Sequence, residues 1–167
     1  MSTYKNIDMK RTIVLRFLFF TVLALFSSVV YSQSNGYVNL GLPSGTLWKD
    51  QNENGFYDYS SAVQKYGRML PTKAQAEELK TKCRWTWTGN GFKIVGPNGK
   101  SIYLPACGCI HCDGSYNEVS CGYYWTCTPD DSEAAWTLDF MLSSVLGPRV
   151  YIGDTFRCVH GTIRLVK

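Results

Sequence analysis

Short stretches in which apolar and polar residues alternate recur along the chain, as in strands with one buried face. Between three of them stand Gly89-Asn90-Gly91 and Pro97-Asn98-Gly99, which have the composition of tight turns. An Asn-Gly pair between alternating runs is a strong hairpin signal, so this part predicts a three-stranded antiparallel meander. The strands predicted in all are 37–40, 46–48, 85–88, 92–95, 101–104, 123–127, 134–140, a weaker one at 143–151, and 162–166.

A clear helical signal lies in the first half of the chain. Thr72 and, three residues later, Gln75 form a capping-box pattern at the start of a segment of good helix formers. The apolar positions that follow, Ala76, Leu79 and Cys83, recur at helical spacing but are few. We therefore predict a helix that ends near residue 83 and packs on one side only.

A shorter helix is predicted before this one, and a long loop after the meander. Ser60 or Ser61 could cap a helix that ends at Tyr66, where Gly67 is placed as a stop. Residues 106–120 show little periodicity and are rich in Gly, Cys, Asp and Ser. Loops of this length in compact domains are commonly functional. An N-terminal strand, two helices and then strands with long loops predict an α+β fold.

The N-terminus has the pattern of a secretory signal peptide. Met9-Lys10-Arg11 is followed by a largely apolar run over residues 17–30 and a small-residue cleavage site after Ser32. A membrane anchor is the alternative, but the unbroken apolar stretch is shorter than the roughly 20 residues that a span needs. We therefore predict a signal peptide over residues 1–32, one domain over residues 33–167 and no stable membrane span after cleavage. The predicted location is secreted or cell-surface, with the periplasm as a further option.

The positive charge of the chain belongs largely to this leader. The leader holds four of the 17 basic and one of the 13 acidic residues, so residues 33–167 carry a net charge of +1. A domain this close to neutral lacks the positive footprint of a nucleic-acid-binding protein. We therefore predict that nucleic acid is not a partner.

All seven cysteines lie after the leader, and secreted domains of this size commonly form disulfides. Because seven is odd, at least one must stay free, pair with another chain or bind something. Cys107, Cys109 and Cys112 crowd around His111, and a thiolate–imidazole cluster is zinc chemistry in kind. The spacing is not a standard zinc pattern, so we favour disulfides and predict no metal and no cofactor. The spacing does not say which bonds form, and Cys83 is interpreted as a plain buried thiol.

Signals for calcium binding and for catalysis are weak. The acidic stretch at residues 129–133 could offer oxygen ligands to calcium, but we interpret it as a solvated turn. The chain has only two histidines, His111 and His160, and it lacks the Gly-x-Ser-x-Gly and His-Glu-x-x-His motifs. We therefore predict that the protein is not an enzyme.

Several short strings along the chain carry a family resemblance. They include Tyr37-Val-Asn-Leu-Gly-Leu-Pro-Ser-Gly-Thr-Leu-Trp48, Leu70-Pro-Thr-Lys73, Leu104-Pro-Ala106, Gly122-Tyr-Tyr-Trp125 and Gly161-Thr-Ile-Arg-Leu-Val166. They resemble the Fibrobacter succinogenes major paralogous domain family of secreted Bacteroidetes proteins. The resemblance implies a C-type-lectin-like fold with two helices, a small antiparallel sheet and long irregular loops. In such a fold the first and last strands pair, which makes residues 37–40 and 163–166 the expected partners.

Within this family the chain most resembles targets of diversity-generating retroelements, whose C-terminal third is varied to bind new ligands. It departs from them at Ala106-Cys-Gly-Cys-Ile-His111, where the subset usually has Ala-Ala-Gly-Tyr-Arg-Asn. Family members similar to this chain often carry cysteine at both positions matching Cys112 and Cys158, which implies a disulfide between them. The pairs Cys121–Cys127 and Cys107–Cys109 are further candidates.

The resemblance implies a ligand-binding face built from loop residues beside the framework strings. Its predicted members are Ile110, His111, Asp113, Tyr116, Asn117, Thr137, Asp139, Asp154, Phe156 and His160. We therefore predict a non-catalytic secreted or cell-surface module that binds an unknown protein or glycan. Two alternatives stay open: a structural or adhesive surface component, and an enzyme of the formylglycine-generating type. Those enzymes are fold relatives that use a cysteine pair, for which Cys107 and Cys112 are the candidates here.

Overall fold

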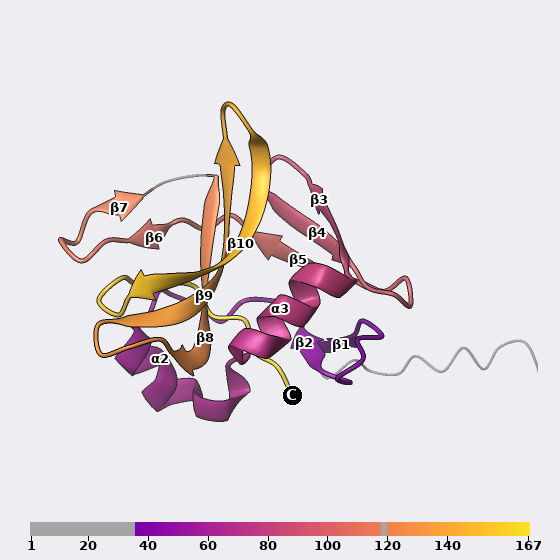
Figure 1. The fold of residues 1–167 in the computed structure, drawn as a ribbon, viewed down its shortest axis with the longest axis horizontal. Coiled ribbons are helices and arrows are strands. Elements are labelled where there is room, and N and C mark those ends of the chain that lie inside the picture. The colour runs from indigo at the N-terminus through magenta and orange to yellow at the C-terminus, as the bar shows by residue number, and fades with distance from the viewer. Residues whose placement is uncertain (1–35, 118–119) are drawn as a thin grey trace, which may run out of the picture. The chain divides into compact units, whose positions relative to one another are not determined.

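The described part of the chain has an α+β fold dominated by antiparallel strands, as the order of elements predicted. A computed structural model describes residues 36–117 and 120–167, so the predicted signal peptide lies outside the described residues. The elements in Figure 1 are β1 (Tyr37–Asn39), β2 (Leu47–Lys49), α2 (Tyr59–Tyr66), the 3-10 helix η1 (Gly67–Met69), α3 (Lys73–Lys82), β3 (Arg84–Trp87), β4 (Gly91–Val95), β5 (Ser101–Pro105), β6 (Cys109–Ile110), β7 (Tyr116–Asn117), β8 (Cys121–Pro129), β9 (Ala134–Ser143) and β10 (Gly147–Phe156). Within those two stretches, no helix is long and apolar enough to cross a membrane.

Helix α3 begins and packs as its sequence pattern predicted. The Gln75 backbone N–H donates to Thr72 Oγ1 at 3.2 Å, and the Thr72 backbone N–H donates to Gln75 Oε1 at 2.8 Å. These two bonds complete the capping box. Only Ala76 and Leu79 of the helix are buried, so α3 contacts the core along one narrow stripe.

Helix α2 begins earlier than predicted, because Asp58 caps it rather than Ser60 or Ser61. The Asp58 carboxylate accepts hydrogen bonds from the Ser61 backbone N–H at 3.0 Å and from Ser61 Oγ at 2.7 Å. A carboxylate at the N-cap also interacts favourably with the positive end of the helix. The predicted stop is confirmed: Gly67 follows the last helical residue with φ of +50°.

Replacing Asp58 with alanine should lower the free energy of unfolding by about 1 kcal/mol, the usual value of a lost N-cap. Hydrogen bonds from Ser61 hold the pKa of Asp58 below its ordinary value. The carboxylate therefore stabilises the fold above its unfolded-state pKa, and this stability is lost as the pH falls through the folded-state pKa. Urea unfolding measures the change, with Ser60→Ala on the exposed side of the same turn as control. An equal loss in both variants would contradict the assignment of the cap.

Two three-stranded antiparallel sheets contain most of the strand residues. Strands β3, β4 and β5 form the predicted meander, with Trp85 opposite Ile94. Strands β8, β9 and β10 form the second sheet. The weak strand predicted at 143–151 is confirmed only in part: residues 147–151 belong to β10, but a tight turn in which Ser143 pairs with Gly147 interrupts the predicted segment, and Gly147 has φ of +71°. Strands β9 and β10 are thus the two arms of a long hairpin, whose tip projects at the top of Figure 1.

The segment predicted as a long irregular loop contains a small hairpin. Strands β6 and β7 pair, with Cys109 opposite Asn117. The hairpin joins β8 through the Gly108 N–H, which donates to the Cys121 carbonyl at 2.8 Å. Gly108 has φ of +73°, and a Cβ at this position would lie 2.1 Å from the Asn117 carbonyl oxygen. Only glycine fits here, which fixes where the hairpin leaves the sheet.

The C-terminal segment pairs with β2 and not with residues 37–40, so the expected pairing of first and last strands is wrong. The backbones of Leu47 and Lys167 exchange two hydrogen bonds of 2.8 and 3.1 Å, and the Lys49 N–H donates to the Leu165 carbonyl at 2.9 Å. Strand β1 occupies the other edge of β2. Strand β2 therefore separates the two segments that were expected to be neighbours.

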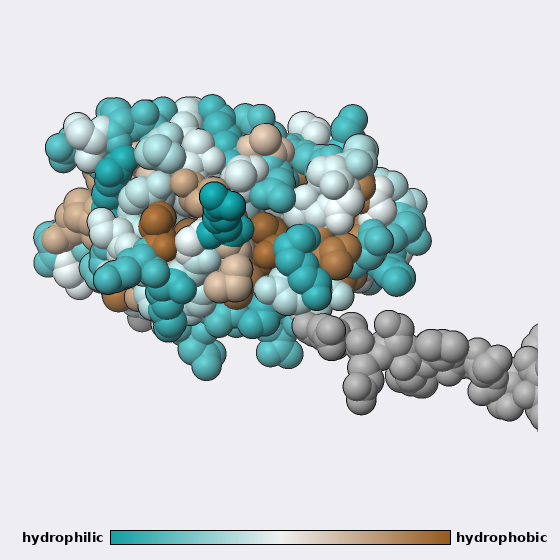
Figure 2. Space-filling model, turned by 90° about the horizontal axis from the view of Figure 1, so that it is seen from below, coloured by the Kyte–Doolittle hydropathy of each residue, from teal (hydrophilic) through white to brown (hydrophobic). Residues whose placement is uncertain are grey.

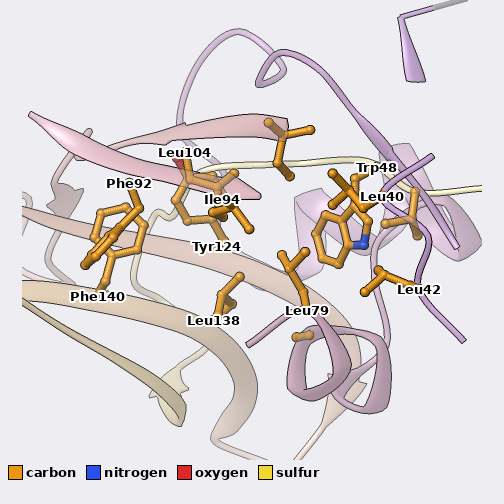
Figure 3. Packing of buried hydrophobic residues seen from close by; sticks show 13 residues of the cluster. Leu40, Leu42, Trp48, Leu79, Phe92, Ile94, Leu104, Tyr124, Leu138 and Phe140 are labelled. Atoms are coloured by element: carbon orange, nitrogen blue, oxygen red, sulfur yellow. The ribbon is translucent and has the colours of Figure 1, made fainter. Parts of the chain in front are cut away.

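Buried apolar side chains form two clusters. The first joins α3, the meander and β9, and it includes Leu79, Ile94 and Leu138, as Figure 3 shows. The second surrounds Trp125 and joins α2 to the C-terminal segment. On the face seen in Figure 2, apolar side chains stand as separate islands among polar ones.

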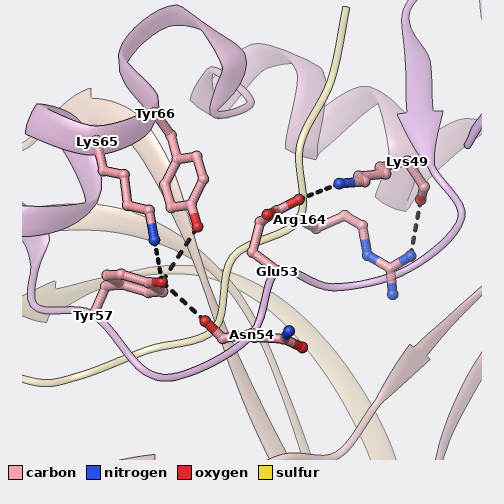
Figure 4. Close-up of polar contacts among 7 residues, drawn as sticks. All are labelled: Lys49, Glu53, Asn54, Tyr57, Lys65, Tyr66 and Arg164. Carbon is pink, nitrogen blue, oxygen red and sulfur yellow. Dashed lines mark hydrogen bonds and ion pairs between the residues drawn. The ribbon is translucent and has the colours of Figure 1, made fainter.

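A buried arginine ties the C-terminal segment to two strands. Arg164 is 1% exposed, and its guanidinium donates to the carbonyl oxygens of Lys49 at 2.8 Å and Tyr103 at 2.6 Å. Figure 4 shows the bond to Lys49, whose ammonium in turn forms an ion pair with Glu53. Burial lowers the pKa of Arg164, and the neighbouring Tyr124 acts in the opposite direction. Two backbone carbonyls therefore solvate a cation inside the domain.

Candidate functional site

A pocket of about 340 Å³ lies on the part of the domain built by the C-terminal strands. It is lined by β6 and the loop after it, by all three strands of the second sheet, and by the segment after β10. The lining residues are Cys109, His111, Tyr123, Ala134, Asp139, Asp154, Thr155, Phe156 and Val159. This volume falls within the range of small-molecule and side-chain pockets.

The alternation of β8 and β9 explains why both Tyr123 and Asp139 reach this pocket. Tyr123 lies opposite Asp139, and Asp139 lies opposite Tyr151, so these three side chains leave the same face of the sheet. The other face carries Tyr124 and Leu138, which belong to the first hydrophobic cluster. One face of the sheet therefore makes the core, and the other is left to form a site.

The disulfide between Cys112 and Cys158, implied by the resemblance, is present. Their Cα atoms are 5.1 Å apart, and the bond joins the loop after β6 to the segment after β10. Beside it, the backbones of Ile110 and His160 exchange two hydrogen bonds of 3.1 and 2.9 Å. Two walls of the pocket are thus fixed to each other by one covalent bond and a short backbone ladder.

The other cysteines are free, so the predicted pairs Cys121–Cys127 and Cys107–Cys109 are wrong. Burial raises the pKa of Cys83 and of Cys109 to about 11, which keeps both thiols protonated and unreactive at neutral pH. Over residues 36–117 and 120–167, no three His, Cys, Asp or Glu side chains are grouped so as to hold a metal ion.

Asp139 is the unusual titratable group of the pocket. Its Oδ1 is inaccessible to solvent and has no hydrogen-bond partner within the described part of the chain. Desolvation raises the pKa of Asp139 to about 7; a hydrogen bond from Thr137 opposes this shift, and the charge of Asp154 adds to it. Near neutral pH this carboxyl is therefore about half protonated, whereas an exposed aspartate is ionised.

The domain should lose stability as the pH rises from about 4 to above 7, and Asp139→Asn should abolish that loss. The folded-state pKa lies above the unfolded-state value, so in this window the folded state binds more protons and deprotonation favours unfolding. The effect should be on the order of 2 kcal/mol, allowing for partial exposure. Urea unfolding at several pH values measures it. Asp113→Asn is the control, because bonds from Ser115 lower the pKa of Asp113. A wild-type stability that rises across this window, or a variant with an unchanged slope, would contradict the assignment.

Four members of the predicted face line the pocket: His111, Asp139, Asp154 and Phe156. Thr137 is wrongly included in that face. It is 1% exposed, and its hydroxyl hydrogen-bonds to the Gly153 carbonyl at 3.2 Å. It therefore has no surface to offer a ligand.

The other predicted members surround the pocket without lining it. Tyr116 is exposed and donates from its hydroxyl to the Cys107 carbonyl at 2.7 Å, and the Asp113 carboxylate accepts from Ser115 Oγ at 2.6 Å. Ile110, Asn117 and His160 are half-buried and act through their backbones, which build the β6–β7 hairpin and join it to the segment after β10. Their contribution is to shape the wall that carries His111.

The sequence interpretation missed five lining residues: Cys109, Tyr123, Ala134, Thr155 and Val159. Tyr123 could have been found, because its neighbour Tyr124 is buried and strand residues alternate between faces. Comparisons with protein-family models, with curated proteins and with solved structures gave no match to this chain.

Proposed function

We propose that the protein is a non-catalytic binding module of C-type-lectin-like fold, a member of the Fibrobacter succinogenes major paralogous domain family. In this proposal a signal peptide exports it to the outside or the surface of the cell. Its ligand is a protein or a glycan, received at the pocket of the second sheet. The observation that carries the proposal is that His111, Asp139 and Phe156, far apart in the sequence, line one pocket.

The contrast between framework and pocket supports a binding face whose residues can vary. Within the strings that carry the resemblance, Leu104, Trp125 and Arg164 are buried at 1% exposure or less. The pocket residues Asp154 and Phe156 lie outside those strings and are exposed. Substitutions at such positions change the surface without changing the core, as a varied binding face requires.

Binding of residues 33–167 to arrays of glycans and of surface proteins tests the proposal. We expect a ligand whose binding is lost in Phe156→Ala and in His111→Ala while the Cys112–Cys158 bond and the circular dichroism spectrum are retained. Met69→Ala is the matched control, because Met69 is an exposed apolar residue of η1, outside the pocket. Equal binding by all three variants would show that the pocket is not the binding site.

A structural or adhesive role is the second candidate, because the tip of the β9–β10 hairpin exposes apolar side chains. Val145 is 87% and Leu146 is 60% exposed. Apolar groups gathered at a projecting tip are typical of interaction sites. If this role holds, the protein should self-associate with rising concentration in sedimentation experiments, and Val145→Asp should prevent it. Self-association that persists in the variant would show that the hairpin tip is not the contact site.

The enzyme alternative lacks the cysteine pair on which it depended. Cys112 is bonded to Cys158, so Cys107 and Cys112 do not form a pair of free thiols. The Asn52 amide contacts Cys107 Sγ at 3.7 Å, and burial raises the pKa of Cys107. A protonated, half-buried thiol is a poor nucleophile and a poor metal ligand.

A further inference from the structure

The pocket contains a carboxyl group with no counter-charge. We infer that it receives a cationic nitrogen, the ammonium of a lysine or the guanidinium of an arginine side chain of a protein ligand, with Asp139 as the counter-charge. This inference rests on the proposed function and specifies the ligand chemistry of the same pocket. It commits to a protein side chain, and a bound metal ion or a neutral group is an outcome that would overturn it.

The charge of the lining favours a cation. Among the lining residues, Asp139 and Asp154 are acidic, and none is lysine or arginine. Arg157 lies close in the sequence but is engaged elsewhere. Its Nε donates to the Ala134 carbonyl at 3.1 Å, and its guanidinium lies 5.0 Å from the centroid of the Tyr59 ring. Among the residues that the structure describes, no lysine or arginine therefore lines this pocket to neutralise Asp139.

The hydrogen bonding of Asp139, a residue of the pocket lining, is incomplete. Its buried Oδ1 has no donor within the described residues. A buried carboxylate oxygen without a donor is costly, so a cation in the pocket that balances the charge of the carboxylate recovers free energy without having to contact Oδ1 itself. A Cβ at position 153 would crowd the other oxygen, because it would lie 3.1 Å from Asp139 Oδ2. Glycine at 153 therefore keeps a neighbouring side chain from pressing on the carboxylate.

The apolar part of the lining suits the stem of a long basic side chain. Phe156 is 66% exposed and borders the same pocket as Tyr123 and Val159. Lysine and arginine side chains bury an apolar stem while their charged heads seek polar partners, and cations are attracted to aromatic ring faces. A ring beside a carboxylate therefore matches both parts of such a side chain.

Binding of a cation should be linked to the proton of Asp139. The titratable groups around this carboxyl are Cys109 of β6, Cys121 and Tyr123 of β8, Asp154 of β10 and His111 of the hairpin loop. Burial raises the pKa of Cys109 to about 11 and that of Tyr123 to about 12, and it also raises the pKa of Cys121. These three groups stay neutral between pH 6 and pH 8. Protonation of Asp139, whose pKa burial raises to about 7, is then the change that we expect to alter affinity.

The size of the linkage follows from the population of the ionised form. With a pKa of about 7, Asp139 is roughly one-tenth ionised at pH 6 and nine-tenths ionised at pH 8. Apparent affinity scales with the fraction of the protein in the binding-competent form, so it should rise about tenfold over this range.

The experiment is a titration of the domain, followed by NMR, with N-acetyl-lysine methylamide and N-acetyl-arginine methylamide at pH 6 and pH 8. N-acetyl-norleucine methylamide is the neutral probe of matching length. We expect the basic probes to bind more tightly at pH 8 and to shift the signals of residues 123, 139 and 156, with little effect of the neutral probe. Asp139→Asn should remove the pH dependence, whereas Asp113→Asn, outside the pocket lining, should retain it.

Several outcomes would overturn the inference. They are equal binding of the neutral probe, a pH-independent affinity of the wild-type protein, no binding of either basic probe, or displacement of the basic probes by calcium or zinc. The wild-type pH profile decides the matter even if Asp139→Asn does not fold. Failure of the probes, together with an array ligand lost in Phe156→Ala, would reject the cation and leave the binding module standing. If the basic probes do not bind and no array ligand depends on Phe156, the proposed function is rejected as well.

Discussion

Replacing Arg164 with methionine should lower the free energy of unfolding by about 3 kcal/mol or more. Methionine fills much of the same volume but donates no hydrogen bond, so the carbonyls of Lys49 and Tyr103 would stay buried without this donor. Each buried polar group left unpaired costs about 1–3 kcal/mol. The cost should exceed the gain from no longer desolvating a guanidinium, because the two carbonyls are held in place by β2 and β5.

Urea unfolding of the wild-type domain and of the variant measures this effect. Arg84→Met on β3 is the matched control, since Arg84 is exposed and its loss should change stability by less than about 0.5 kcal/mol. If Arg164→Met proved as stable as the wild type, desolvation of the cation would outweigh its two hydrogen bonds. In that case Arg164 would make no net contribution to the stability of the fold.

Removing the disulfide should have the second large effect. The double variant Cys112→Ser and Cys158→Ser opens a loop with a sequence separation of 46 residues, and closing a loop of that length is worth about 4 kcal/mol. Reduction of the wild-type protein should cause a similar loss. Ligand binding should weaken too, because the bond holds two walls of the pocket together.

Unfolding by urea, with and without a reductant, tests this expectation, and mass spectrometry should find Cys112 linked to Cys158. Cys127→Ser is the control, since Cys127 is a free, half-buried thiol. A reductant that leaves the wild type unchanged, or a control variant as unstable as the double variant, would show that the bond does not hold the domain together.

Local chemistry explains most of what could be predicted of the fold. The capping box of Thr72 and Gln75, and the turns at Asn90-Gly91 and Asn98-Gly99, act over three or four residues, so their effects can be recognised in a single chain. Strand pairing is not local. Alternation indicated a strand at residues 37–40 and another at 162–166, but nothing in either segment specified that β2 would lie between them. The weak strand predicted at 143–151 had the wrong start for a local reason, because Gly147 was not recognised as a turn residue.

The candidate site was predictable where side chains lie in loops or at strand ends, and less so where they lie within strands. His111 and Phe156 were expected because they stand beside framework strings. Tyr123 was missed because an aromatic residue inside a strand resembles core until its face is known. Thr137 shows the opposite error: it leaves the same face as Asp139, but Thr155 hydrogen-bonds to its hydroxyl, and it is buried. Side-chain direction was predictable at this position, whereas coverage by the neighbouring strand was not.

The C-terminal segment is needed to complete both hydrophobic clusters, yet it is synthesised after their other members. Ile163 and Leu165 belong to the cluster around Trp125, and Val166 belongs to the cluster around Leu79. Neither cluster can close until these residues are available. A ribosome delivers them after every other member of the two clusters, so the growing chain holds two unfinished apolar surfaces until these residues emerge. Helper proteins that shield the nascent chain should therefore matter more for this domain than for a helical bundle of equal length, whose contacts form as each segment emerges.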